Sequence, residues 1–142
     1  MTARLPENLV ILFVVVAGCI ASGVDAAAEI KCNPDGAQNQ INVCAAQDAE
    51  SADRELNEVY RAVLRKEGED GGFIAKLRVS QRAWIAYRDA ELSATYACTD
   101  PDSRQCWGSM YPMCYASYKA LLTRERSARL KKYLDEGREY CP

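Results

Sequence analysis

Apolar residues recur at helical spacing along three long segments of the chain, with polar residues between them. The first segment, residues 37–67, contains no glycine or proline. At about 100° per residue, its apolar side chains gather on one side of a helix. These side chains are Ile41, Ala45, Ala49, Ala52, Leu56, Val59, Tyr60 and Val63. The opposite side carries Glu50 and Arg54, an i,i+4 pair in the favourable order. The pattern predicts a long amphipathic helix with a solvated charged face.

Two further helices are predicted at residues 73–96 and 113–136. Glycines in segment 68–72 separate the second helix from the first, and Gly137 ends the third in the manner of a C-cap. The second helix is expected to bury Phe73, Ile74, Leu77, Trp84, Ile85 and Leu92. The third is expected to turn inward Tyr115, Tyr118, Leu121, Leu122 and Tyr133. No segment shows the alternation typical of a strand, so the predicted fold is all-α, a small bundle of about three main helices.

Polar residues interrupt the apolar stripes of these helices. Arg88 lies in the middle of the second stripe, and an unpaired buried charge costs several kcal/mol. We therefore expect Asp53 or Glu125 to supply a carboxylate partner. The predicted internal polar network consists of Asp53, Asn57, Gln81, Arg88 and Arg126.

The N-terminal residues 1–28 have the features of a signal peptide. Their apolar core, residues 9–17, is shorter than the roughly 20 residues of a membrane-spanning helix. Residues 16–19 resemble a lipobox, in which Cys19 would receive a lipid; cleavage near residue 28, after three alanines, is the alternative. A third possibility is that the apolar segment is retained as a membrane-anchoring helix. The mature domain, residues 29–142, is thus predicted to reach the periplasm or cell envelope.

The chain has seven cysteines, and removal or acylation of Cys19 leaves six. These are Cys32, Cys44, Cys98, Cys106, Cys114 and Cys141. None of them forms a Cys-x-x-Cys motif, so in an oxidising compartment they predict three disulfides rather than a zinc or redox site. The spacing leaves the connectivity open.

Composition argues against several classes of protein. A net charge of −2 gives no global field for binding nucleic acid or an anionic membrane surface. The chain has no histidine, which removes histidine-based catalytic arrangements and zinc sites. The acidic pairs Asp89 with Glu91 and Asp100 with Asp102 fit a helix surface and a turn better than a glycosidase site. The chain is therefore predicted not to be an enzyme and to need no cofactor or metal.

An ordered set of motifs resembles a known family. The set comprises Cys44-Ala45, the Ala-Asp, Leu-Asn and Tyr positions of 52–60, the segment Gln-Arg-Ala-Trp-Ile-Ala-Tyr-Arg-Asp-Ala at 81–90, Gly-Ser-Met at 108–110, and the Leu-Thr, Arg and Leu positions of 122–130. Over residues 32–134 this order is similar to the family of bacterial cell-envelope proteins named after the mycobacterial lysozyme inhibitor LprI. The resemblance implies a disulfide-bonded helical domain that, in its namesake, binds and inhibits lysozyme. Members commonly have cysteines where this chain has Leu92 and Tyr118, so their disulfide pattern does not transfer.

The segment between the second and third helices is the candidate contact element. A lysozyme cleft holds two catalytic carboxylates and binds sugars along a groove. A blocking loop needs cations or hydroxyls for the acids and aromatic area for the sugar subsites. The candidate partner-binding residues are Arg104, Trp107, Ser109 and Tyr111. Disulfides at Cys106 and Cys114 would lower the ordering cost of binding.

Three functions remain compatible with this loop. The preferred one is an exported, lysozyme-binding inhibitor that blocks the active-site cleft. The alternatives are an envelope interaction module with a partner other than lysozyme, and a peptidoglycan-binding module that stacks sugars on Trp107 and Tyr111. The same residues also suit a purely structural use, in which they close one end of the bundle.

Overall fold

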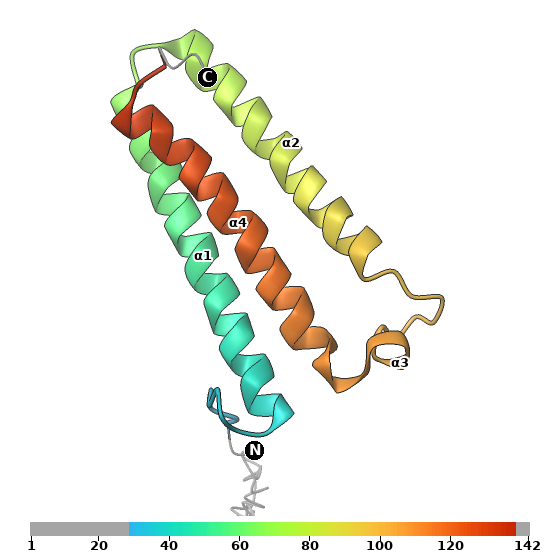
Figure 1. Cartoon of the computed structure of the whole chain (residues 1–142). Coiled ribbons are helices and arrows are strands. Elements are labelled where there is room, and N and C mark those ends of the chain that lie inside the picture. Colours follow the sequence, from blue (N-terminus) through green and yellow to red (C-terminus); the bar gives the residue numbers. More distant parts are fainter. Residues whose placement is uncertain (1–28, 139–142) are drawn as a thin grey trace, which may run out of the picture.

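The computed structural model describes residues 29–138. The predicted signal peptide, Cys19 and Cys141 lie outside this range. Along the chain come α1 (Gln38–Lys66), α2 (Gly71–Thr95), the short α3 (Arg104–Trp107), the 3-10 turn η1 (Gly108–Met110) and α4 (Tyr111–Asp135) (Figure 1). Residues 29–138 contain no strand, which confirms the all-α prediction. None of their helices is both long enough and apolar enough to span a membrane.

Helices α1 and α4 lie side by side and run in the same direction (Figure 1). Helix α2, which comes between them in the sequence, runs in the opposite direction. The main core cluster consists of Leu56, Val59, Val63, Leu77 and Leu130. A second cluster of Ala49, Ala52 and Ala120 lies nearer the start of α1. Because alanine side chains are short, the two helix backbones can approach closely along this stretch. The α1–α4 pair thus holds most of the core.

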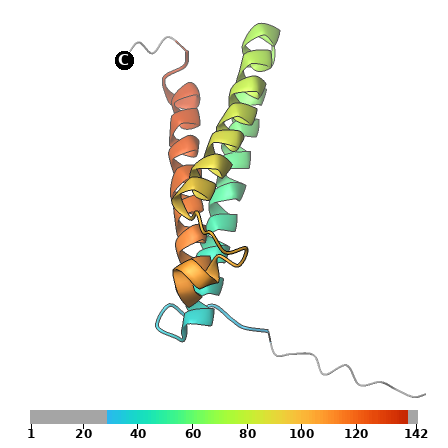
Figure 2. The ribbon, with the colours of Figure 1, turned by 90° about the vertical axis from the view of Figure 1, so that its right-hand side faces the viewer.

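Helix α2 crosses this pair obliquely, from the end of α1 to the start of α4 (Figure 2). Only two residues of α2, Leu77 and Leu92, are buried. Ile85, predicted to face inward, is 39% exposed, and Leu121 of α4 is 52% exposed. Both predictions were wrong because the described residues supply no layer that covers the outer side of α2 and α4.

The helix ends follow local chemistry. Asp70 caps α2 by accepting a hydrogen bond from the Phe73 backbone N–H at 2.8 Å, which lets the helix begin at Gly71, earlier than predicted. Pro112 lies in the first turn of α4, where its missing N–H costs nothing. Gly137 follows the end of α4 with a φ of 76°, a left-handed conformation that glycine adopts without strain.

Two disulfides are present among the described cysteines. Cys32–Cys44 ties the segment before α1 to that helix, and Cys98–Cys106 closes the segment after α2. Cys114 forms no disulfide with another described cysteine, so residues 29–138 show two of the three predicted disulfides. The turn at residues 99–103 brings the Cα atoms of Cys98 and Cys106 to 5.9 Å, within the range of a disulfide.

Candidate functional site

The candidate loop lies at the end of the bundle where α2 finishes and α4 begins (Figure 1). The Tyr96 ring, at the C-cap of α2, forms the centre of an aromatic cluster. Its centroid lies 5.4 Å from Trp107, 5.7 Å from Tyr115, 5.9 Å from Tyr111 and 6.4 Å from Tyr118. Edge-to-face aromatic contacts of this kind add to the stability gained from burial alone. The cluster therefore anchors the loop on two helices at once.

Hydrogen bonds reinforce this anchor. The Tyr96 hydroxyl donates to the Cys114 carbonyl at 2.9 Å, and burial raises the pKa of this phenol. The Tyr118 hydroxyl donates to Glu91 at 3.1 Å, and this bond raises the pKa of Tyr118. Both bonds join α2 to α4.

The loop itself is also constrained. The Asp100 carboxylate accepts from the Asp102 backbone N–H at 2.8 Å, and Asp102 accepts from the Arg104 N–H at 3.0 Å. These are the local turns that aspartate favours. Gly108, the first residue of η1, has a φ of 67°, a conformation that a side chain would strain. Together with Cys98–Cys106, these contacts fix the backbone that presents the candidate residues.

The predicted contact residues divide into two groups. Trp107 is 44% exposed although its ring touches Tyr96, and the side chains of Arg104 and Ser109 are exposed. The Ser109 carbonyl accepts from the Asn42 side chain at 3.1 Å, which ties η1 to the start of α1. Tyr111 is half-buried, with its ring against Tyr96 and Tyr115, so most of it serves the cluster.

Sequence reasoning missed one exposed residue of this loop. The side chain of Met110, which directly follows Ser109 in the sequence, is 51% exposed. A flexible methionine adapts well to irregular surfaces. Its position between two cysteines, Cys106 and Cys114, was the available signal. Beside the loop lies a cavity of about 490 Å³ whose walls include Tyr96, Tyr111 and Tyr115.

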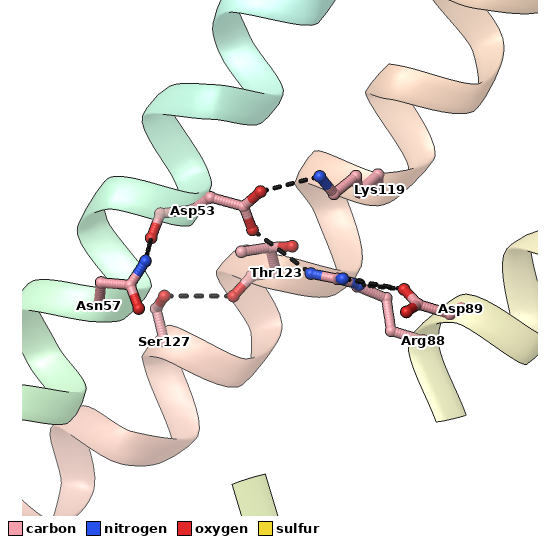
Figure 3. A network of polar contacts seen from close by, with 7 residues as sticks. All are labelled: Asp53, Asn57, Arg88, Asp89, Lys119, Thr123 and Ser127. Atoms are coloured by element: carbon pink, nitrogen blue, oxygen red, sulfur yellow. Dashed lines mark hydrogen bonds and ion pairs between the residues drawn. The ribbon is translucent and has the colours of Figure 1, made fainter. Parts of the chain in front are cut away.

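The predicted polar network forms two separate clusters in the structure. In the first, Arg88 contacts Asp53 at 3.3 Å and Asp89 at 2.8 Å, and Asp53 also pairs with Lys119 at 2.8 Å (Figure 3). Asp53, rather than Glu125, is thus the carboxylate across from Arg88. The Asn57 side chain donates to the Asp53 carbonyl at 2.9 Å. This cluster joins all three long helices, and sequence reasoning missed Lys119 and Asp89.

The second cluster lies farther along α2 and α4. The Arg126 guanidinium donates to the Gln81 side chain at 3.0 Å and to the Ser80 hydroxyl at 3.0 Å. Both partners are neutral. Nothing in residues 29–138 groups three or more histidine, cysteine, aspartate or glutamate side chains in a way that would hold a metal ion.

Comparison with known proteins identifies the family. A family profile described as "Lysozyme inhibitor LprI" matches residues 30–130, which include α1, α2, the loop and most of α4. The chain belongs to the LprI family. An uncharacterised protein of Rhizobium meliloti (strain 1021) is 36% identical over 120 residues, which cover 77% of this chain and 82% of that protein. No solved structure matches the chain. The family is described as one of inhibitors rather than enzymes.

Proposed function

We propose that this LprI-family protein is exported, binds lysozyme and inhibits it by placing the loop of residues 98–111 in the active-site cleft. Two kinds of observation support the proposal. The family is described as lysozyme inhibitors, and the two disulfides suit a protein that matures in an oxidising compartment. The partially exposed Trp107, which lies next to the Cys98–Cys106 disulfide with its ring against Tyr96, is the observation that carries the choice of contact element.

The chemistry of the loop complements that of the cleft. Lysozyme holds one protonated and one ionised carboxyl group at its catalytic centre, above a groove for sugars. Arg104 would approach the ionised carboxylate, and the Trp107 ring would occupy a sugar subsite. Tryptophan and arginine are the residue types most enriched at interface hot spots. Because the loop backbone is already fixed, binding would order little more than side chains.

The test is a titration of the oxidised domain, residues 29–142, into animal-type lysozyme, with cell-wall lysis and binding heat followed together. The proposal expects stoichiometric loss of lysis and submicromolar binding. Trp107→Ala is expected to weaken binding by tenfold or more, as loss of a hot-spot side chain does, and Arg104→Ala by less. Circular dichroism would confirm that each variant is folded.

Val79→Ala is the matched control, because Val79 is an apolar residue of α2, 56% exposed and outside the loop. It should inhibit like the parent. Full inhibition by both loop variants would reduce the loop to a connector. Absence of binding would favour an envelope partner other than lysozyme, and binding to cell-wall fragments without lysozyme would favour a peptidoglycan-binding module.

A further inference from the structure

A second recessed surface lies between α2 and α4, outside the loop. A cavity of about 220 Å³ is lined by Trp84 and Tyr87 of α2 and by Leu122, Glu125, Arg126 and Arg129 of α4. A neighbouring cavity of about 240 Å³ shares Arg129 and adds Lys132, Tyr133, Gly137 and Arg138. We call the first cavity and its lining the α2–α4 groove. Among the described residues that line the two cavities, Glu125 is the single acidic side chain.

Arg126 carries its charge into this groove without a carboxylate. Its two hydrogen-bond partners, Gln81 and Ser80, are neutral, and no acidic residue of the described chain lies within ion-pair distance. Burial lowers the pKa of Arg126, and the charge of Arg129 lowers it further. Arg129, one turn away and exposed, likewise has no carboxylate partner in residues 29–138.

Other basic residues of α4 do form ion pairs with carboxylates. Arg124 forms two hydrogen bonds with Asp48, and Lys131 contacts Glu55 at 2.6 Å, both across to α1. Lys119 pairs with Asp53. The side of α4 that faces α1 is therefore neutralised, whereas the groove keeps an excess of positive charge. The partly buried Arg126 beside Arg129 does not stabilise the fold, since the repulsion of the two arginines and the desolvation of Arg126 both cost free energy.

Aromatic surface accompanies this charge. Tyr87 is 56% exposed although it lies beside Trp84 on the groove wall. Arg88 stacks over Trp84 with its guanidinium carbon 5.2 Å from the ring centroid, which helps to hold that indole in place. Tyrosine, tryptophan and arginine together are the composition of the energetic centre of a protein interface.

We propose that the α2–α4 groove binds an acidic, partly apolar segment of a partner protein. An aspartate or glutamate carboxylate of that segment would lie between Arg126 and Arg129, and a neighbouring apolar side chain would pack on Trp84 and Tyr87. A planar guanidinium matches the two oxygens of a carboxylate. The cavity has room for one or two side chains, which suits a peptide better than a run of charged sugars. This groove would accept a convex acidic partner, whereas the loop suits a concave one.

The experiment measures binding of a fluorescent glutamate-rich peptide that carries leucines, titrated with the oxidised mature protein. The same peptide with glutamine in place of glutamate is the neutral probe. Arg129→Gln leaves the internal contacts of Arg126 in place, and Arg61→Gln, an exposed arginine of α1 outside the groove, is its matched control. The expected results are binding of the acidic peptide only, about tenfold weaker binding by Arg129→Gln, and no change for Arg61→Gln. Tyr87→Ala should also weaken binding of the acidic peptide.

Several outcomes would overturn the proposal. Equal losses for the two arginine variants would indicate unspecific attraction by charge, and equal binding of the glutamine peptide would remove the carboxylate from the recognition. Absence of binding would also reject the groove as a peptide site. Tighter, Arg129-dependent binding of polygalacturonate would make the ligand an anionic glycan instead. Lysozyme titrations of Arg129→Gln distinguish the two proposals, because inhibition through the loop should persist in this variant.

Discussion

The α1–α4 pair and α2 use similar lengths of helix but bury them to different extents. Six of the 29 residues of α1 and five of the 25 residues of α4 are buried, against two of the 25 residues of α2. The buried residues of α2, Leu77 and Leu92, lie toward its two ends. Between them the partly buried Trp84 packs against the main core cluster. Polar contacts add to this attachment, in which Arg88 reaches Asp53 of α1 and Gln81 accepts from Arg126 of α4.

This difference separates stability from recognition within one small domain. Burial of apolar area is the main favourable term in folding, so the free energy of unfolding should reside largely in the α1–α4 pair. Helix α2 adds less burial and keeps side chains such as Tyr87 and Val79 in solvent. The exposed side chains of the loop at its end and of the groove along its flank can consequently vary without loss of the core.

The largest effect on stability is expected when a buried side chain of the α1–α4 pair is shortened. Leu130 of α4 is fully buried in the main core cluster. Leu130→Ala should lower the free energy of unfolding by about 2–5 kcal/mol, because it removes transfer free energy and leaves a cavity. Urea denaturation followed by circular dichroism measures the loss. Val79→Ala, on the exposed side of α2, should change stability by less than about 0.5 kcal/mol. Similar losses for the two variants would erase the proposed contrast.

A smaller effect is expected from the polar attachment of α2. The side chain of Arg88 is 13% exposed and pairs with Asp53, so Arg88→Gln should cost about 2 kcal/mol, below the usual range for a fully buried pair. Lys119 still neutralises Asp53 in this variant and limits the loss. Arg54→Gln is the control, since its pair with Glu50 is 66% and 71% exposed and should contribute less than about 0.5 kcal/mol. If both variants lost equally little, α2 would be held by burial alone.

Much of this fold was predictable from periodicity. Apolar spacing located all three long helices within about two residues of their ends, and it placed Leu56, Val63, Leu77 and Leu92 in the core. Periodicity assigns a face to each residue but does not say what covers that face. Ile85 and Leu121 lie on stripes that would be buried in a fuller bundle, and the oblique crossing of α2 leaves them exposed.

The candidate site was predictable only in part, for the same reason. Composition singled out Arg104 and Trp107 as candidate contact residues, and both are exposed in the structure. It did not predict the central position of Tyr96 or the pairing of Cys98 with Cys106. Those depend on how the turn at residues 99–103 folds over two helices. Likewise, Arg126 was predicted to join Arg88 in one network. Its neutral partners on α2 became visible only once the crossing of α2 and α4 was known.

The smallest effect on stability should come from a substitution in the turn between α1 and α2, and this effect should depend on pH. Asp70 caps α2 through the Phe73 N–H and contacts Arg138 at 2.7 Å, and these bonds lower the pKa of its carboxyl group below 3.8. A lowered pKa in the folded state means that the ionised carboxylate contributes stability at pH values above the pKa of the unfolded state, near 3.9. This stability is lost as the pH falls through the pKa of the folded state.

Asp70→Asn keeps a capping oxygen but removes the charge. Its thermal midpoint should therefore lie slightly below that of the parent at pH 7, and the difference should shrink as the pH falls below about 3.9. Asp35→Asn is the control, because the Asp35 carboxylate has no hydrogen bond or ion pair with a described residue, and it should leave the thermal midpoint at pH 7 unchanged. A constant difference between Asp70→Asn and the parent across this range would mean that α2 begins where it does because of the capping geometry alone.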